Sequence, residues 1–156
     1  DPTRHTILID RGEDHDVYVG QPVLDADGLM GQVIEVYRSS SKVLLITDSA
    51  HALPVQVLRN GVRSIAEGTS DFRTLSLRYV ANSTDIEEGD QLVSSGLGGR
   101  FPSGYPVGTV TSVRVLPGQA YLEVTLTPSA KIDRSRHLLL VFSAIETLGE
   151  DQDGSR

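Results

Sequence analysis

The segment "YLEVTLT" at residues 121–127 decides the fold class of this chain. Its apolar residues Leu122, Val124 and Leu126 alternate with polar ones. This period of two is typical of a strand that buries one face. The segment "TLSLRYV" at residues 74–80 has the same alternation. Both segments therefore predict β-strands.

Short β-branched runs extend this pattern over the rest of the chain. Further predicted strands lie at residues 6–9, 32–37, 42–47, 53–57 and 106–115. Pro54 lacks an N–H group and indicates an edge strand, and Asp27-Gly28 suits a hairpin turn with positive φ. Helix signals are poor. We predict an all-β fold with little helix and about eleven strands.

An internal repeat divides these strands into two sets. Four segments recur in the same order, and they pair residues 6–10 with 74–78, 19–23 with 88–93, 31–36 with 108–113, and 42–50 with 122–130. Gly20 and Gly89 are expected to close equivalent turns. The repeat predicts two small, pseudo-repeated β-barrel domains at residues 1–70 and 71–145, followed by a disordered polar tail at 146–156.

Composition excludes several classes of function. The chain has 156 residues, a net charge of −7 and no cysteine. An acidic surface does not attract a phosphate backbone, so no nucleic-acid partner is expected. Disulfides and thiol chemistry are excluded. No apolar run approaches the roughly 18 residues that span a bilayer. Since the chain lacks an initiator Met, we expect it to be a fragment whose membrane anchor, if any, lies upstream.

The stretch "SSGLGGRFPSGYPVG" at residues 94–108 is an insertion in the second repeat. Ten residues separate Gly20 from Gly31, whereas eighteen separate Gly89 from Gly108. The extra residues predict a surface loop. Its residues Phe101, Pro102 and Tyr105 are the predicted protein-interaction site, and the alternative is that the aromatic rings tuck back onto the barrel.

Phosphate-binding and hydrolytic motifs are incomplete. The glycines at 96–99 lack the Lys-Ser/Thr pair of a phosphate loop, and Pro102 prevents the helix that such a loop begins. A hydrolase could use His51 with Ser94 or Ser95, but no nucleophile-elbow motif is present. His51 is otherwise expected to be a surface or turn residue, like His5, His15 and His137.

Metal and cofactor sites are not predicted either. The acidic segment at residues 10–16 is rich in oxygen ligands but does not match a calcium-binding loop. It is expected to be a solvated loop. No catalytic residue, metal or cofactor is therefore assigned, and elimination favours a binding or scaffold role.

The motifs at residues 93–110 resemble the MreC family of bacterial rod-shape-determining proteins. The resemblance lies in Val-Ser-Ser-Gly, a glycine-rich step, Phe101-Pro102 and the turn at residues 104–108. The segments at 44–55 and 19–33 are also similar to that family. In all, the resemblance extends over roughly residues 6–142, most of the chain.

The resemblance implies a non-enzymatic scaffold of the cell-elongation machinery. Such a protein lies in the periplasm and is held to the inner membrane by an N-terminal helix that this chain would lack. The implied partners are a class B penicillin-binding transpeptidase, an MreD-type membrane partner and further copies of itself. Two alternatives stay open: a hydrolase of the chymotrypsin-like barrel class, and a cell-wall carbohydrate-binding β module, for which the chain has few aromatic residues.

Overall fold

The computed structural model describes residues 4–135 and 137–142. Within them the chain forms eleven strands and one short 3-10 helix, η1 (Glu13–His15), and no α-helix. The strands are β1 (Thr6–Ile9), β2 (Pro22–Leu24), β3 (Leu29–Val36), β4 (Ser41–Leu45), β5 (Ala52–Val57), β6 (Arg63–Gly68), β7 (Leu75–Arg78), β8 (Gln91–Ser94), β9 (Pro106–Val115), β10 (Leu122–Pro128) and β11 (Leu139–Leu140). The predicted all-β class is confirmed. The predicted disordered tail at 146–156 lies outside the described residues.

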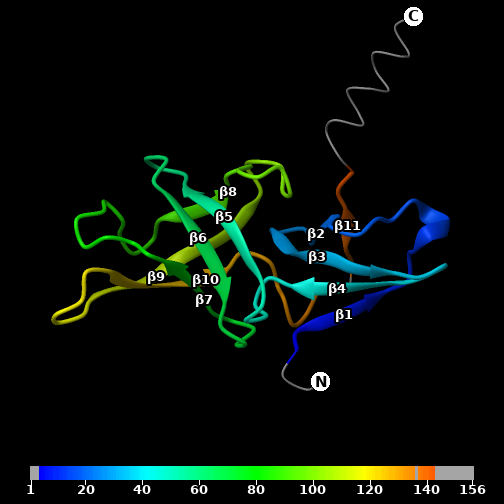
Figure 1. Cartoon of the computed structure of the whole chain (residues 1–156), viewed down its shortest axis with the longest axis horizontal. Helices are drawn as coiled ribbons and strands as arrows, with labels where there is room; N and C mark the ends of the chain where they lie inside the picture. Colours follow the sequence, from blue (N-terminus) through cyan, green and yellow to red (C-terminus); the bar gives the residue numbers. More distant parts are fainter. Residues whose placement is uncertain (1–3, 136, 143–156) are drawn as a thin grey trace, which may run out of the picture.

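The strands form two sheets that lie side by side (Figure 1). One is a five-stranded sheet in the order β1-β4-β3-β2-β11. The other is a closed barrel in the order β10-β7-β6-β5-β8-β9. Every hydrogen-bonded pair of strands is antiparallel. We refer to these parts as the first sheet and the barrel.

The predicted internal repeat is visible in the strand pairing. In the first sheet β4 lies between β1 and β3, and β3 pairs β2; in the barrel β10 lies between β7 and β9, and β9 pairs β8. Gly20 and Gly89 have φ of 95° and 93° and close equivalent turns, as predicted. Their N–H groups donate to Val33 and Val110, both at 2.8 Å.

One of the four predicted repeat matches has the wrong register. The sequence comparison equates Ser49 with Ser129, but Ile46 and Ser129 make the equivalent backbone hydrogen bonds, to Met30 and Val107, both at 3.0 Å. The β9–β10 pairing contains a register shift, and so does the β3–β4 pairing. A bulge adds a residue without changing the fold, so side-chain similarity alone misplaced the match.

Strand pairing divides the chain at a different place from the predicted domain boundary at residues 70 and 71. Strands β5 and β6 precede that boundary, yet they pair with β8 and β7 in the barrel. Strand β11 returns to pair β2 in the first sheet. The β5–β6 hairpin has no counterpart before β1 among the described residues, so the repeat did not reveal it. As a division into folding domains, 1–70 and 71–145 stays a prediction.

Two local predictions are wrong. Pro54 does not mark an edge, because β5 lies between β6 and β8. It is tolerated since the β5–β8 pairing starts one residue later, at Val55. Gly28 does not have positive φ; instead, a Cβ atom there would lie 2.7 Å from the Pro106 carbonyl oxygen and 2.9 Å from the Ser129 Cβ. Close approach of the first sheet to the barrel therefore requires this glycine.

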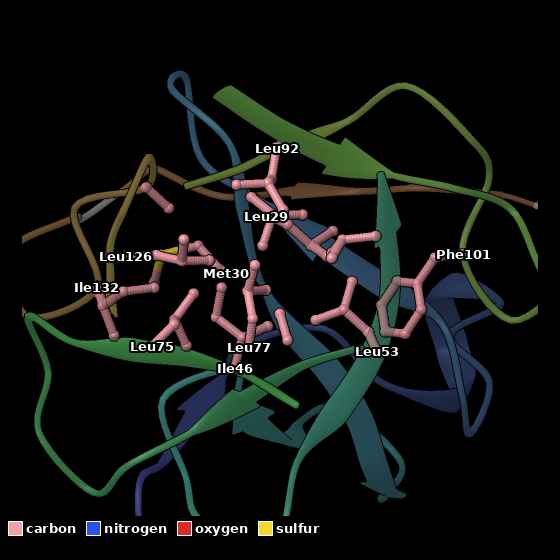
Figure 2. Close-up of a cluster of buried hydrophobic side chains, with 14 of the residues drawn as sticks. Leu29, Met30, Ile46, Leu53, Leu75, Leu77, Leu92, Phe101, Leu126 and Ile132 are labelled. Atoms are coloured by element: carbon pink, nitrogen blue, oxygen red, sulfur yellow. The ribbon is translucent and has the colours of Figure 1, made fainter. Parts of the chain in front are cut away.

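One hydrophobic core continues through both sheets. It joins Leu29 and Met30 of β3 to Leu53 of β5 and to Leu75 and Leu126 of the barrel (Figure 2). Alternate residues of β7 and β10 face this core, as the period of two predicts. Within the described residues, no helix is long and apolar enough to cross a membrane.

Candidate interaction groove between the two sheets

The insertion between β8 and β9 is a loop that is fixed at its base by Ser94. The Ser94 hydroxyl donates to the Pro102 carbonyl at 2.6 Å and accepts the Tyr105 N–H at 3.0 Å. The Ser94 carbonyl accepts the Gly104 N–H at 2.8 Å. Ser94 is fully buried, so these bonds are shielded from water and hold the loop in one conformation. The predicted surface loop is thus present and has an ordered base.

Phe101 tucks back from this loop into the core. Its side chain is 3% exposed and points towards Leu53 (Figure 2). Tyr105 is partly buried against the same core, and Pro102 is partly exposed. Of the three predicted interaction residues, Phe101 therefore anchors the loop with its ring. A role of these residues in partner binding stays a prediction.

The loop forms one wall of a groove of about 900 Å³. The facing wall comes from the first sheet and includes Tyr18 and Val19 before β2, the residues 32–34 of β3, and Val141 and Phe142 after β11. We call this feature the interaction groove. Val19 is 65% exposed and Phe142 is about half exposed at its edge, so apolar surface meets water there.

Sequence reasoning identified only the loop wall of the interaction groove. The facing wall combines residues 18–22 and 32–34, which are neighbours through the β2–β3 hairpin, with residues 141–142, which are distant in the sequence. Its one local signal is Val19, an aliphatic residue in a turn. That signal could have been noticed because the equivalent residue of the second repeat is Glu88.

His51 lies beneath the loop and is buried. Its side chain is 4% exposed and its ring meets Phe101 edge-on at 5.8 Å. The pKa of His51 is lowered to about 4, mainly by burial; the negative charge of Asp48 partly opposes this shift, and the positive charge of Arg100 adds to it. His5 is also buried and stacks on Phe72 at 3.8 Å. Both histidines are therefore buried, and the expectation that they lie at the surface is wrong.

The structure does not assemble the hydrolytic site of the alternative prediction. Neither ring nitrogen of His51 has a hydrogen-bond partner among the described residues. The hydroxyl of Ser94 bonds backbone groups of the loop, and that of Ser95 accepts the Leu97 N–H. A nucleophilic serine needs a base within hydrogen-bond reach, and no such pair forms here.

The acidic segment at residues 10–16 does not gather into a metal site. In the part of the chain that the structure describes, no three His, Asp or Glu side chains lie close enough to hold an ion together. Asp48 is an acidic residue near His51. Its carboxylate accepts hydrogen bonds from the N–H groups of His5 and Ala50 at 2.7 and 2.8 Å. Its carboxylate also pairs with Arg4 at 3.3 Å, so two backbone donors and one cation already contact it.

Comparison with known proteins agrees with this architecture. The family model described as "Rod shape-determining protein MreC, barrel core" matches residues 1–142. The cell shape-determining protein MreC of Escherichia coli (strain K12) is 48% identical over 144 residues, which are 92% of this chain and 39% of that protein. The crystal structure of MreC from Pseudomonas aeruginosa superposes with a TM-score of 0.88 at 58% identity, over 91% of this chain and 92% of that one.

Two more distant structures share the fold. A complex between penicillin-binding protein PBP2 and MreC from Helicobacter pylori matches with a TM-score of 0.66 at 21% identity, over 90% of this chain and 88% of that chain. A structure of the major periplasmic domain from the cell shape-determining filament MreC matches with a TM-score of 0.67 at 23% identity, over 81% and 79%.

The chain spans only part of its curated relatives. It covers 39% of the Escherichia coli protein and 40% of the Haemophilus influenzae one, to which it is 50% identical. The family model nevertheless matches all of the described residues. Together with the two related sheets and the loop motif, these matches show that the chain belongs to the MreC family of cell shape-determining proteins.

Proposed function

We propose that this chain is a non-catalytic periplasmic scaffold of the machinery that synthesises peptidoglycan during cell elongation. In this role it binds a class B penicillin-binding transpeptidase, associates with further copies of itself and helps to maintain rod shape. The structure of a relative in complex with PBP2 supports the first partner. The description of another relative as a periplasmic domain of a filament supports the compartment and the self-association.

The interaction groove is the observation that carries this proposal. It exposes apolar side chains such as Val19 and Phe142 on a rigid base, and such surface on a soluble domain marks sites of protein binding. The paired nucleophile and base that hydrolysis requires are absent from the groove's described residues. Binding is therefore the function that this geometry supports best.

The remaining partners belong to the longer protein. An MreD-type membrane partner and an inner-membrane anchor are proposed from the family alone, and no described residue carries either. In this proposal the transpeptidase acts in the periplasm, beside the membrane. A scaffold that binds one conformation of the transpeptidase more tightly than another would change the amount of active enzyme. Such a shift requires only different affinities for the two conformations.

Titration of the chain with the periplasmic part of an elongation transpeptidase tests the proposal. We expect a 1:1 complex in sedimentation and calorimetry, and Val19→Glu should weaken it at least tenfold. Val115→Glu is the matched control, since Val115 is 73% exposed and lies outside the interaction groove. Absence of binding by the wild-type chain would contradict the proposed function. Equal effects of both variants would place the interface elsewhere.

A second candidate function, carbohydrate binding by a cell-wall β module, has one supporting observation. Tyr79 and Tyr121 form an exposed aromatic pair with ring centroids 5.6 Å apart. Exposed aromatic faces can stack on the C–H groups of sugar rings because the face of an aromatic ring carries a negative electrostatic potential. Co-sedimentation with insoluble peptidoglycan tests this function: wild-type chain should pellet, and the variants Tyr79→Ala and Tyr121→Ala should stay in solution.

A further inference from the structure

We infer that the interaction groove binds a short apolar segment of the transpeptidase that carries a carboxylate, and that this carboxylate pairs with Arg100. The inference rests on the proposed function, because it specifies which part of that partner enters the groove. It also assigns a role to a residue that neither the loop motif nor the hydrophobic core explains.

Charge is the first argument. Among the described residues that line the interaction groove, Arg100 is the one with a charged side chain. The structure gives Arg100 no ion pair or hydrogen-bonded partner within the described residues, whereas Arg59 and Arg78 are each bonded to carboxylates. The chain as a whole has a net charge of −7. A lone cation beside low-dielectric apolar walls attracts a carboxylate and disfavours a second cation.

The apolar walls give the rest of the specificity. Val19, Pro22, Ile34 and Phe142 surround the space that Arg100 faces. A segment with only charged side chains would place polar atoms against the apolar walls. A wholly apolar segment would remove water from the guanidinium group of Arg100 and leave it without a partner. The lining therefore favours a segment in which apolar residues flank one Asp or Glu.

Rigidity lets this site bind without reordering. Arg100 precedes Phe101, whose ring is fixed in the core, and the loop base is closed by the buried hydroxyl of Ser94. The backbone of Arg100 is thus held while its side chain remains exposed. A preordered wall loses little conformational entropy on binding, which favours affinity.

The turn before β2 gives independent support. Residues 18–21 are Tyr-Val-Gly-Gln, whereas the equivalent turn before β8, at residues 87–90, is Glu-Glu-Gly-Asp. Acidic residues at the first turn would neutralise Arg100 within the chain. Their replacement by apolar residues on the groove side keeps that charge available for a partner.

Calorimetric titration with the periplasmic part of the transpeptidase, at two salt concentrations, tests the inference. Removal of a charge-assisted pair should weaken binding about tenfold for Arg100→Gln and about a hundredfold for Arg100→Glu. The salt dependence of the affinity should also decrease in both variants. Arg73→Glu is the matched control, because Arg73 is exposed and lies outside the groove; it should change the affinity less than about threefold.

A charge swap identifies the partner's carboxylate. Asp→Lys or Glu→Lys substitutions in apolar surface segments of the transpeptidase should include one that restores binding to Arg100→Glu. Thermal melts check that each variant is folded. If the wild-type chain binds but Arg100→Glu and Arg73→Glu behave alike, the inference is overturned and the proposed function stands. If the wild-type chain does not bind at all, the proposed function itself fails. If Arg100→Glu alters only self-association, the groove's occupant is a second copy and the inference is likewise overturned.

Discussion

The turn before β2 and the turn before β8 have one backbone geometry and opposite side-chain chemistry. Their glycines, Gly20 and Gly89, differ in φ by 2° (95° and 93°) and make the same hydrogen bond to β3 and β9. The first turn carries Tyr18 and Val19, and the second carries two glutamates. Because acidic residues occupy a turn of the same backbone geometry, this geometry does not require the apolar ones. Their exposure beside the interaction groove is better explained by binding.

The same comparison extends to the residue after each glycine. Gln21 and Asp90 are both buried and each accepts a backbone N–H three residues earlier. Asp90 is then paired with Arg59 at 2.9 Å, and this hydrogen bond holds the pKa of Asp90 below its usual value. The amide nitrogen of Gln21 has no hydrogen-bond partner among the described residues.

Phe142 occupies the place in the first sheet that Arg59 occupies in the barrel. The preceding residues, Val141 and Leu58, donate equivalent hydrogen bonds to β2 and β8, at 3.0 and 2.8 Å. The barrel thus uses this position to neutralise a buried acid, whereas the first sheet exposes an aromatic ring at the groove. The two copies of the repeat therefore differ in chemistry at this position, with an ion pair in the barrel and an exposed aromatic side chain in the first sheet.

The largest expected effect concerns the insertion, which only the second repeat has. Phe101→Ala should lower the free energy of unfolding by about 3–5 kcal/mol, because it removes a buried ring from the core beneath the loop. Urea denaturation measures this loss, and Phe101→Leu should recover most of it. A loss below about 1 kcal/mol for Phe101→Ala would mean that the loop does not depend on this anchor.

The next prediction transplants the barrel's ion pair into the first sheet. Gln21→Asp should destabilise the chain by about 3 kcal/mol, since a buried carboxylate without a partner is costly. Adding Phe142→Arg should restore at least about 1 kcal/mol, measured as the coupling energy of a double-mutant cycle. Gln21→Asn is the control that changes length without charge. If Phe142→Arg has the same effect in both backgrounds, the two positions are not equivalent.

A pH-dependent prediction concerns His51 beneath the insertion. Its pKa is about 4 in the folded chain and 6.5 as the reference for an unfolded one. As the pH falls below 6.5, the unfolded chain binds a proton that the folded chain does not. The contribution of His51 to stability is therefore fully present above pH 6.5 and is lost progressively between pH 6.5 and pH 4. Between pH 7.5 and 4.5 this loss should be about 2–3 kcal/mol.

Urea denaturation at the two pH values, with His51→Asn as the comparison, isolates this contribution. The variant has no imidazole to protonate, so its stability should fall less than that of the wild-type chain over the same interval. The difference between the two falls is the quantity attributed to His51. Equal falls would indicate that His51 is protonated in the folded state or reaches water.

Much of the fold could be predicted because its signals are local. Period-two alternation identified β7 and β10, and the paired turns at Gly20 and Gly89 revealed the repeat. The register of the last match and the membership of β5 and β6 could not be predicted in this way. Bulges change register without a strong sequence signal, and which strands close a barrel depends on contacts between distant segments.

The candidate site was half predictable for the same reason. The loop at residues 94–108 was recognised from its length and glycines, but the facing wall requires β2, β3 and the segment after β11 to meet. The burial of Phe101 and His51 likewise depends on contacts between segments that are distant in the sequence, since the two rings meet each other. The burial of Phe101 was one of two alternatives that the sequence left open, whereas that of His51 was not predicted, because a polar neighbour in sequence says little about neighbours in space.

The smallest expected effect sharpens the comparison at the ends of β1 and β7. Tyr79 follows β7 with φ of 58°, a left-handed conformation that is costly for a residue with a Cβ atom. Its ring is 73% exposed, so burial does not offset that cost. Tyr79→Gly and Tyr79→Ala both remove the ring, and the glycine variant should be more stable by about 1 kcal/mol.

Arg11, the equivalent residue after β1, supplies the matched control. It is not among the residues with positive φ, so glycine there only adds freedom to the unfolded chain. Arg11→Gly should therefore be less stable than Arg11→Ala, by up to about 1 kcal/mol. Urea denaturation of the four variants gives both differences. If glycine is more stable than alanine at position 79 but less stable at position 11, the repeated strands end in different backbone conformations. If the glycine–alanine difference in stability has the same sign at both positions, the left-handed conformation of Tyr79 is contradicted.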